Sequence, residues 1–166
     1  MKMTNLIWED TVNYRKPALF IGTAYCSFKC GKAYCQNAAL EGAAIQDVEA
    51  GVVIDRYLSN PLTEAIVFGG LEPLDQMDEL ADFVALLNYR NVKDDLVIYT
   101  GYTEQEATEK IGYIRRLNRY RELIVKYGRY LPGKPARYDE ILGVTLVSDN
   151  QYAVRYPWEA NEDAGK

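Results

Sequence analysis

Hydrophobic residues in this chain occur as short apolar runs separated by longer segments with helical spacing. The apolar runs predict four buried strands, at residues 17–25, 63–70, 95–101 and 122–128. Two later runs, at 143–149 and 151–157, predict one or two further strands. Glycine or polar residues end most of these runs, as expected where a strand gives way to a turn.

The segments between the strands have the periodicity of amphipathic helices. Residues 47–58, 75–89 and 103–117 carry apolar side chains at intervals of three and four. The second segment has the strongest pattern, with an apolar face formed by Met77, Leu80, Phe83, Val84 and Leu87. Thr103 and Glu106 have the spacing of a capping box, which predicts that the third helix begins there.

Strands that alternate with helices of this length predict an α/β fold with a mostly parallel sheet and right-handed crossovers. The units are too few to close an eight-fold barrel. We therefore expect a single-domain partial (β/α) barrel, or an open curved sheet, with the helices on the outside. The domain is expected to span residues 1–157, with a polar C-terminal tail at 158–166.

Ligands of such folds bind at the carboxyl ends of the strands. Three loops directly follow predicted strands: the cysteine segment at residues 24–37, the glycine turn at 69–73 and the short turn at 100–102. If the strands are parallel, all three loops converge on one edge of the sheet. The sequence therefore predicts a functional site at that edge.

The composition narrows the classes of function. The 166 residues are 48% hydrophobic and 26% charged, close to ordinary globular usage, and the net charge is −5. This charge argues against nucleic acid or an anionic membrane as the main partner. No segment is apolar enough to span a bilayer, and the N-terminus turns acidic where a signal peptide would be apolar. We expect a cytoplasmic location, where clustered cysteines favour metal binding or catalysis over disulfides.

The chain contains no histidine. This absence excludes Ser-His and Cys-His catalytic pairs and every mixed Cys/His zinc site. Chemistry therefore has to come from thiolates, carboxylates, Tyr, Lys, Arg or a bound cofactor.

All three cysteines, Cys26, Cys30 and Cys35, lie within ten positions. A short loop can wrap three thiolates around one face of an iron–sulfur cluster, for which thiolate is the preferred ligand. Three ligands for a four-iron cluster leave one iron with an open position, which can bind a small chelating molecule.

Two alternatives to a cluster stay open. One is a zinc site completed by a carboxylate, and the other is a set of buried cysteines without metal. Lys29 and Lys32 lie between the cysteines and indicate an exposed loop, in which nearby positive charge favours the thiolate form.

The cysteine segment resembles the signature of the radical S-adenosylmethionine (radical SAM) superfamily, in which three cysteines follow the first strand. In that family the residue before the last cysteine is commonly aromatic and packs near the adenine, and Tyr34 stands at this place. Small members often have Asn two places after the third cysteine, as Asn37 is here. The second cysteine interval is longer here than is usual in the family.

The glycine turn resembles the GGEP turn of the same family, whose backbone and acid hold the methionine amino group. Gly69, Gly70 and Glu72 would carry this role, and Leu71 is inserted between the glycine pair and the acid. A plain turn is the alternative for the two glycines.

Other segments are similar to the anaerobic ribonucleotide reductase activating enzymes, which are small glycyl-radical activases. Residues 97–103 resemble one stretch of them, and residues 127–130 and 143–151 resemble their C-terminal part. The likeness extends in order over residues 10–154.

The resemblance implies an oxidoreductase. Cys26, Cys30 and Cys35 would hold a [4Fe-4S] cluster that cleaves S-adenosylmethionine to a 5'-deoxyadenosyl radical. The radical would take a hydrogen atom from a glycine of the catalytic subunit of an anaerobic ribonucleoside-triphosphate reductase. An electron donor such as flavodoxin or ferredoxin would supply the electron.

The remaining candidate residues each have a second interpretation. Glu72 would bind the methionine ammonium, or it serves as an acid at a helix N-terminus. Thr100 and Tyr102 end a strand on the expected ligand edge, or they simply form a turn. Asn150 and Gln151 would reach the nucleoside or the methionine carboxylate, or they belong to a polar turn.

Arginines at 115, 116, 119 and 121 lie at a helix C-terminus, where they complement the helix dipole or form a docking patch for an acidic partner. Two other functions compete with the activase. One is a radical enzyme that acts on a small molecule or another protein. The other is a non-enzymatic metal-binding protein with the same fold. The short chain favours a protein substrate, because little sequence remains to build a closed small-molecule cavity.

Overall fold

The structure of the chain is a computed structural model that describes residues 1–29 and 31–158. In this part of the chain four parallel strands form the centre of the main sheet: β2 (Ala18–Thr23), β4 (Ala65–Gly70), β5 (Asp95–Tyr99) and β6 (Leu123–Tyr127). Three α-helices precede the last three of these strands: α1 (Ala50–Leu58), α2 (Met77–Tyr89) and α3 (Glu104–Leu117). The antiparallel strands that extend the sheet are β1 (Lys2–Asp10), β3 (Gln46–Asp47) and β9 (Tyr152–Tyr156).

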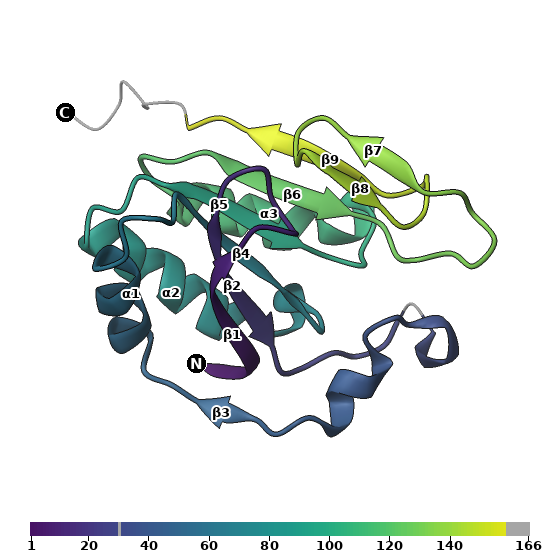
Figure 1. The fold of residues 1–166 in the computed structure, drawn as a ribbon, viewed down its shortest axis with the longest axis horizontal. Coiled ribbons are helices and arrows are strands. Elements are labelled where there is room, and N and C mark those ends of the chain that lie inside the picture. The colour runs from purple at the N-terminus through teal and green to yellow at the C-terminus, as the bar shows by residue number, and fades with distance from the viewer. Residues whose placement is uncertain (30, 159–166) are drawn as a thin grey trace.

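The seven strands lie in the order β3–β1–β2–β4–β5–β6–β9 (Figure 1). Each of the first three parallel strands pairs with the next parallel strand in the sequence, so the crossovers all advance in one direction. The expected α/β fold with a mostly parallel, open sheet is confirmed. A separate hairpin is formed by β7 (Arg137–Asp139) and β8 (Val144–Leu146). The 3₁₀ helices are η1 (Lys32–Tyr34), η2 (Ala38–Gly42) and η3 (Pro73–Asp75).

Both faces of the parallel strands are buried, which explains why their sequences are almost continuously apolar. Alternate side chains point to opposite faces. On β2, Leu19 and Ile21 pack with the three helices in the larger core cluster. Ala18 and Phe20 of the same strand belong to a second cluster with Leu142 and Leu146 of the hairpin region.

The helices lie on one face of the sheet and pack there through their apolar sides (Figure 1). Helix α2 buries the apolar face expected from its spacing, including Leu80, Phe83, Val84 and Leu87. Helix α3 begins with the expected capping box, in which Thr103 accepts from the Glu106 N–H and Glu106 accepts from the Thr103 N–H. None of the described helices is long and apolar enough to cross a membrane.

The chain leaves the carboxyl end of β2 as a long excursion that returns only at β3 (Figure 1). This excursion contains the cysteine segment, η1 and η2. It runs away from the sheet and turns back toward the N-terminal strand. Most of the predicted C-terminal tail, 159–166, lies outside the described residues, as does Cys30.

Candidate functional site

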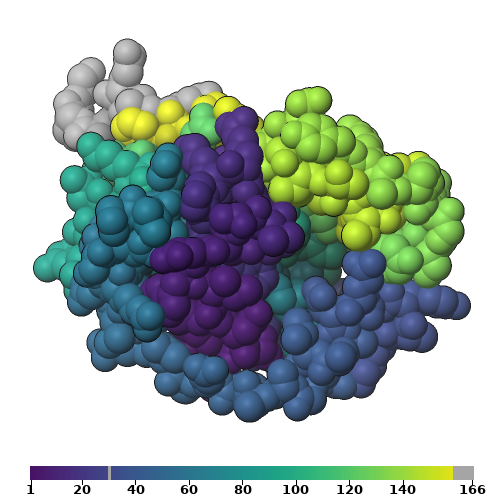
Figure 2. Space-filling model, viewed as in Figure 1, coloured from purple at the N-terminus to yellow at the C-terminus, as the bar shows by residue number. Residues whose placement is uncertain are grey.

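A cavity of about 550 Å³ lies where the carboxyl ends of the parallel strands meet the cysteine segment and the hairpin. Figure 2 shows a hollow between the N-terminal strand in purple, the cysteine excursion in blue and the C-terminal part in yellow-green. The loops that follow β2, β4 and β5 all contribute residues to its wall. The predicted convergence of these three loops is therefore present in the structure.

Cys26 and Cys35 are both half-buried and both line this cavity. The Phe28 backbone N–H donates to Cys26 Sγ at 3.2 Å. In the described part of the chain no three Cys, Asp or Glu side chains form a metal site, and Cys30 lies outside that part. The predicted role of the three cysteines as metal ligands stays a prediction.

The glycine turn needs both of its glycines for steric reasons. A Cβ on Gly69 would lie 2.8 Å from Phe20 Cε2, because the Phe20 ring covers this position. Gly70 has a φ of +81°, and a Cβ there would lie 2.8 Å from the Gly22 Cα of the neighbouring strand. Both glycines line the cavity, so the turn brings bare backbone to its wall.

Glu72 is 6% exposed and lies between the glycine turn and the turn after β5. Its Oε1 accepts from the Leu74 N–H at 3.1 Å and caps η3, while its Oε2 accepts from the Gly101 N–H at 2.9 Å. Burial raises the pKa of the Glu72 carboxyl to about 7, although hydrogen bonds from Gly101, Thr100 and Leu74 oppose the shift. The helix-terminal role is thus present, and the carboxylate also borders the cavity.

Backbone and side-chain hydrogen bonds tie the cysteine segment to the glycine turn at both ends. At its start, the Leu71 N–H donates to Thr23 O at 3.3 Å and the Glu72 N–H donates to Tyr25 O at 2.9 Å. At its end, Asn37 Nδ2 donates to Gly70 O at 2.5 Å. The two loops therefore form one unit around the cavity.

The residues that follow the glycine turn add to this attachment. Gln76 Oε1 accepts from the backbone N–H groups of Ala24 and Tyr25, at 2.6 and 2.9 Å. Asp75 Oδ2 accepts from the Ser27 N–H at 2.7 Å. Asp75 and Gln76 were not expected as site residues, and no spacing in the sequence marks them, because their partners are backbone atoms of a distant loop.

The other expected site residues divide into two groups. Tyr34, Asn37 and Thr100 line the cavity, and Tyr34 is largely exposed there. Tyr102 lies beside the cavity: its hydroxyl donates to Asp75 Oδ1 at 2.5 Å. Asn150 also does not line the cavity, and its Nδ2 donates to Arg129 O at 2.9 Å.

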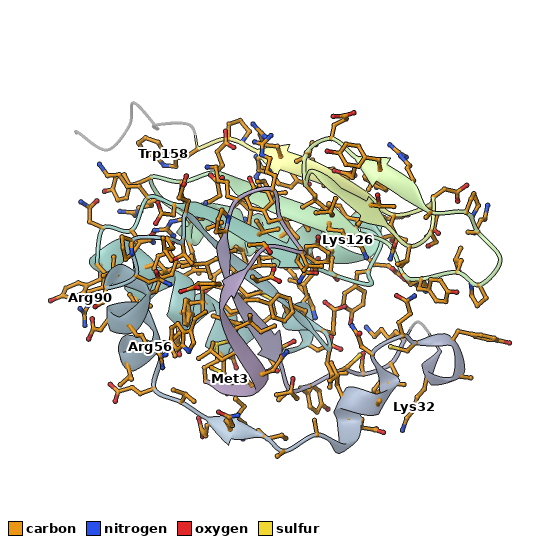
Figure 3. All side chains as sticks on the ribbon, viewed as in Figure 1. Met3, Lys32, Arg56, Arg90, Lys126 and Trp158 are labelled. Carbon is orange, nitrogen blue, oxygen red and sulfur yellow. The ribbon has the colours of Figure 1, made fainter. Side chains whose placement is uncertain are left out.

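Lys126 was not among the expected site residues; it is a side chain of β6 that is 7% exposed and lines the cavity. Its Nζ donates to Gly128 O at 2.8 Å and lies 5.8 Å from the centre of the Tyr99 ring. Burial lowers the pKa of the Lys126 ammonium to about 8, against an opposing effect of the Glu72 charge. Figure 3 shows it near the end of β6.

A sequence signal for Lys126 existed. It is the one charged residue inside the apolar run of β6, and the two-residue period of a strand puts it on the same face as Ile124. Ile124 packs in the core cluster opposite the helices. A lysine on a covered face of a central strand indicates a polar cavity at that point.

The donor set fits an iron–sulfur cluster. Two described thiols line one cavity, a backbone N–H reaches one of the sulfurs, and the chain has no histidine to favour another metal. No curated protein and no solved structure matches the chain. Residues 16–138 match the family described as "4Fe-4S single cluster domain", and since this match covers most of the chain, the protein belongs to that family.

Proposed function

We propose that this protein is a radical SAM enzyme that generates a glycyl radical on the catalytic subunit of an anaerobic ribonucleoside-triphosphate reductase. One observation carries the proposal: the cysteine segment and the glycine turn are hydrogen-bonded to each other around one cavity at the carboxyl ends of parallel strands. The volume of about 550 Å³ is within the range of about 300–1,000 Å³ typical of small-molecule sites.

Cys26, Cys30 and Cys35 would hold the cluster of this family. When bound, the [4Fe-4S] cluster supplies reductive cleavage of S-adenosylmethionine to a 5'-deoxyadenosyl radical, which takes a hydrogen atom from the partner's glycine. Cys26 and Cys35 line the cavity, so thiolates at these positions would hold the cluster at its wall. The short turns of the three loops keep the ligand groups at the sheet edge.

Charged groups of the cavity match the methionine part of S-adenosylmethionine. The Glu72 carboxylate would accept from the ammonium, which would lower the pKa of Glu72 and favour its ionised form. The Lys126 ammonium would pair with the ligand carboxylate in the same way, which would raise its lowered pKa. Gly69 and Gly70 let the backbone approach the ligand without a Cβ in between.

The other candidates would act at the adenosine part or through their neighbours. Tyr34 offers an exposed ring for stacking against the adenine, and Asn37 and Thr100 offer polar groups at the cavity wall. Tyr102 and Asn150 would act as positioning residues, through Asp75 and through the Arg129 backbone.

The mouth of the cavity suits a protein substrate. Its exposed apolar side chains are Ile7, Val12, Tyr34 and Val147. Exposed apolar side chains gathered at one place on a surface are typical of a site that receives another protein or a ligand. We propose that a loop of the reductase enters here, that flavodoxin or ferredoxin supplies the electron, and that the reaction takes place in the cytoplasm, where thiols stay reduced.

A second candidate uses the same chemistry on a different protein or on a small molecule, and the same cavity favours it equally. A non-enzymatic metal-binding protein with this fold is the third. The buried Glu72 and Lys126 argue against it, because a purely structural metal site needs no pair of ionisable groups in an adjoining cavity.

The test uses protein reconstituted without oxygen. We expect about four iron and four sulfide per chain, release of 5'-deoxyadenosine on addition of dithionite and S-adenosylmethionine, and loss of both in Cys35→Ala. Gly42→Ala is the control, because a Cβ at that exposed position meets nothing within 4 Å. A cluster without cleavage would contradict the radical SAM assignment, and zinc in place of iron would contradict the cluster. A glycyl radical signal on added reductase would identify the partner.

A further inference from the structure

Phe28 has an unusual backbone conformation beside Cys26. Its φ is +53°, in the left-handed region that bulky residues rarely adopt. The other described non-glycine residues with positive φ are Asn91 and Tyr120, which follow the ends of α2 and α3. Phe28 instead lies inside the cysteine segment, and its N–H donates to Cys26 Sγ, 3.2 Å away.

Contacts on both sides hold this conformation. The Ser27 N–H is fixed to Asp75 Oδ2 at 2.7 Å, and Phe28 O accepts from the Gly31 N–H at 2.9 Å. Lys32 Nζ lies 5.4 Å from the centre of the Phe28 ring. Groups other than the cysteine thiols therefore hold the peptide that carries the Phe28 N–H. They are the Asp75 carboxylate before it and the turn to Gly31 after it.

We propose that the Phe28 N–H is a built-in hydrogen-bond donor to the first cluster thiolate and raises the reduction potential of the bound cluster. The inference rests on the proposed function only in taking Cys26 as a ligand. A one-electron reductant adds one electron to the cluster, and no bond is made or broken. Because the sulfurs become more negative, an N–H dipole directed at Cys26 Sγ stabilises the reduced state more than the oxidised state.

The effect on the cluster belongs to the backbone N–H of Phe28 and not to its ring. The Phe28 ring itself has Lys32 Nζ above it, 5.4 Å from its centre, and this contact does not involve Cys26. A residue that disfavours a positive φ can escape it only if the peptide before residue 28 or the turn after it rotates, whereas a residue that tolerates it should keep the N–H in place. Glycine does so freely, whereas a β-branched residue is a strong outlier in this region.

The experiment compares Phe28→Gly with Phe28→Val in the full chain, reconstituted without oxygen. Both variants lose the ring, and only the valine variant disfavours the left-handed conformation. The midpoint potential is measured by a redox titration that follows the cluster's EPR signal, without S-adenosylmethionine. We expect Phe28→Gly to match the wild type. In Phe28→Val the ratio of reduced to oxidised cluster at a fixed potential should fall about fivefold, the effect of losing roughly one hydrogen bond.

Equal shifts in the two variants would overturn the inference, because they would assign the effect to the ring. No shift in Phe28→Val would overturn it as well. Hydrogen exchange in the metal-free protein gives a second readout: amides of residues 26–29 should exchange faster in Phe28→Val than in Phe28→Gly. A wild-type protein that binds no iron and sulfide would defeat the proposed function and this inference together, whereas an unshifted potential in a loaded protein defeats this inference alone.

Discussion

Glu72 and Lys126 are two buried ionisable residues that face one cavity from different loops and strands. Burial raises the pKa of Glu72 to about 7 and lowers the pKa of Lys126 to about 8, so desolvation disfavours the charged form of both residues. A ligand that brings an ammonium and a carboxylate would stabilise the charged form of both residues. Such a pair is a costly arrangement for the fold alone, which is the physical reason to connect it with binding.

The first prediction concerns the pH dependence of stability in the metal-free protein. In the folded protein the pKa of Glu72 is raised above its ordinary value of 4.5 to about 7. The protein is therefore more stable below about pH 4.5, where Glu72 is protonated in both states, and it loses this stability as the pH rises through 7. The loss amounts to on the order of 3 kcal/mol. In Glu72→Gln this loss should disappear, so the free energy of unfolding should fall less between pH 5 and pH 8.

Urea denaturation at both pH values measures the effect. Glu109→Gln, at an exposed position on α3, is the matched control and should keep the wild-type pH dependence. The prediction is wrong if the Glu72 and Glu109 variants lose the same free energy between the two pH values.

The second prediction concerns Gly69. In Gly69→Ala the new Cβ would lie 2.8 Å and 2.9 Å from two atoms of the Phe20 ring. The ring or the strand has to move, which costs about 1–3 kcal/mol. Gly42→Ala adds the same methyl group where nothing lies within 4 Å and should change the midpoint little. Thermal unfolding of the two variants checks this, and equal midpoints would show that the Phe20 ring adapts freely.

At the scale of elements, periodicity in the sequence predicts most of the fold. The parallel strands, the three helices and the capping box of Thr103 follow from apolar runs, helical spacing and a local motif. Strand β1 was missed, because its Asn5, Trp8 and Glu9 mix polar and apolar residues along a strand that is only partly buried. The short β7 lies in a polar stretch, where its pairing with β8 is a tertiary interaction that no local pattern shows.

The attachment of the cysteine segment to the elements after β4 gives the third prediction. Hydrogen bonds from Tyr102 and Ser27 hold the pKa of the Asp75 carboxyl below its usual value, although burial alone would raise it. Asp75→Ala removes the acceptor of both bonds, which should cost about 1–3 kcal/mol. It should also free the start of the cysteine segment, so that amides of residues 24–29 exchange hydrogen faster.

Asp82→Ala is the control for this variant, because Asp82 is an exposed acid on α2 and the substitution removes the same charge. We expect wild-type exchange in the cysteine segment of that control. Exchange that stays slow in Asp75→Ala would mean that Gln76 and the backbone bonds of Leu71 and Glu72 hold the segment by themselves.

At the scale of the whole molecule, the site depends on segments that are far apart in the sequence. Parallel topology alone brings the loops after β2, β4 and β5 to one edge, and the sequence therefore predicted where the cavity lies. It could not predict that Tyr102 turns toward Asp75, or that Asn150 turns toward Arg129, because both orientations depend on hydrogen bonds across the fold. Lys126 was predictable in principle, since its charge interrupts an otherwise apolar strand.

The last prediction concerns the linkage between ligand binding and global stability. A ligand that bridges the cysteine segment, the glycine turn and β6 binds only the folded chain. At about 100 times its dissociation constant, S-adenosylmethionine should therefore add about 2.7 kcal/mol to the free energy of unfolding of the protein. For a chain of this size the melting temperature should rise by about 5–10 °C.

Lys126→Met should lose most of this rise, because it removes the cation available to the ligand carboxylate while it keeps an apolar stem of similar length. Lys134→Met removes the same charge at an exposed position that pairs with Asp149 at 3.8 Å, outside the cavity, and should keep the full rise. An equal rise in melting temperature in both variants would show that Lys126 does not take part in ligand binding. Its burial would then reflect only the packing of β6, and the cavity would have to hold the carboxylate through backbone groups or through Arg129.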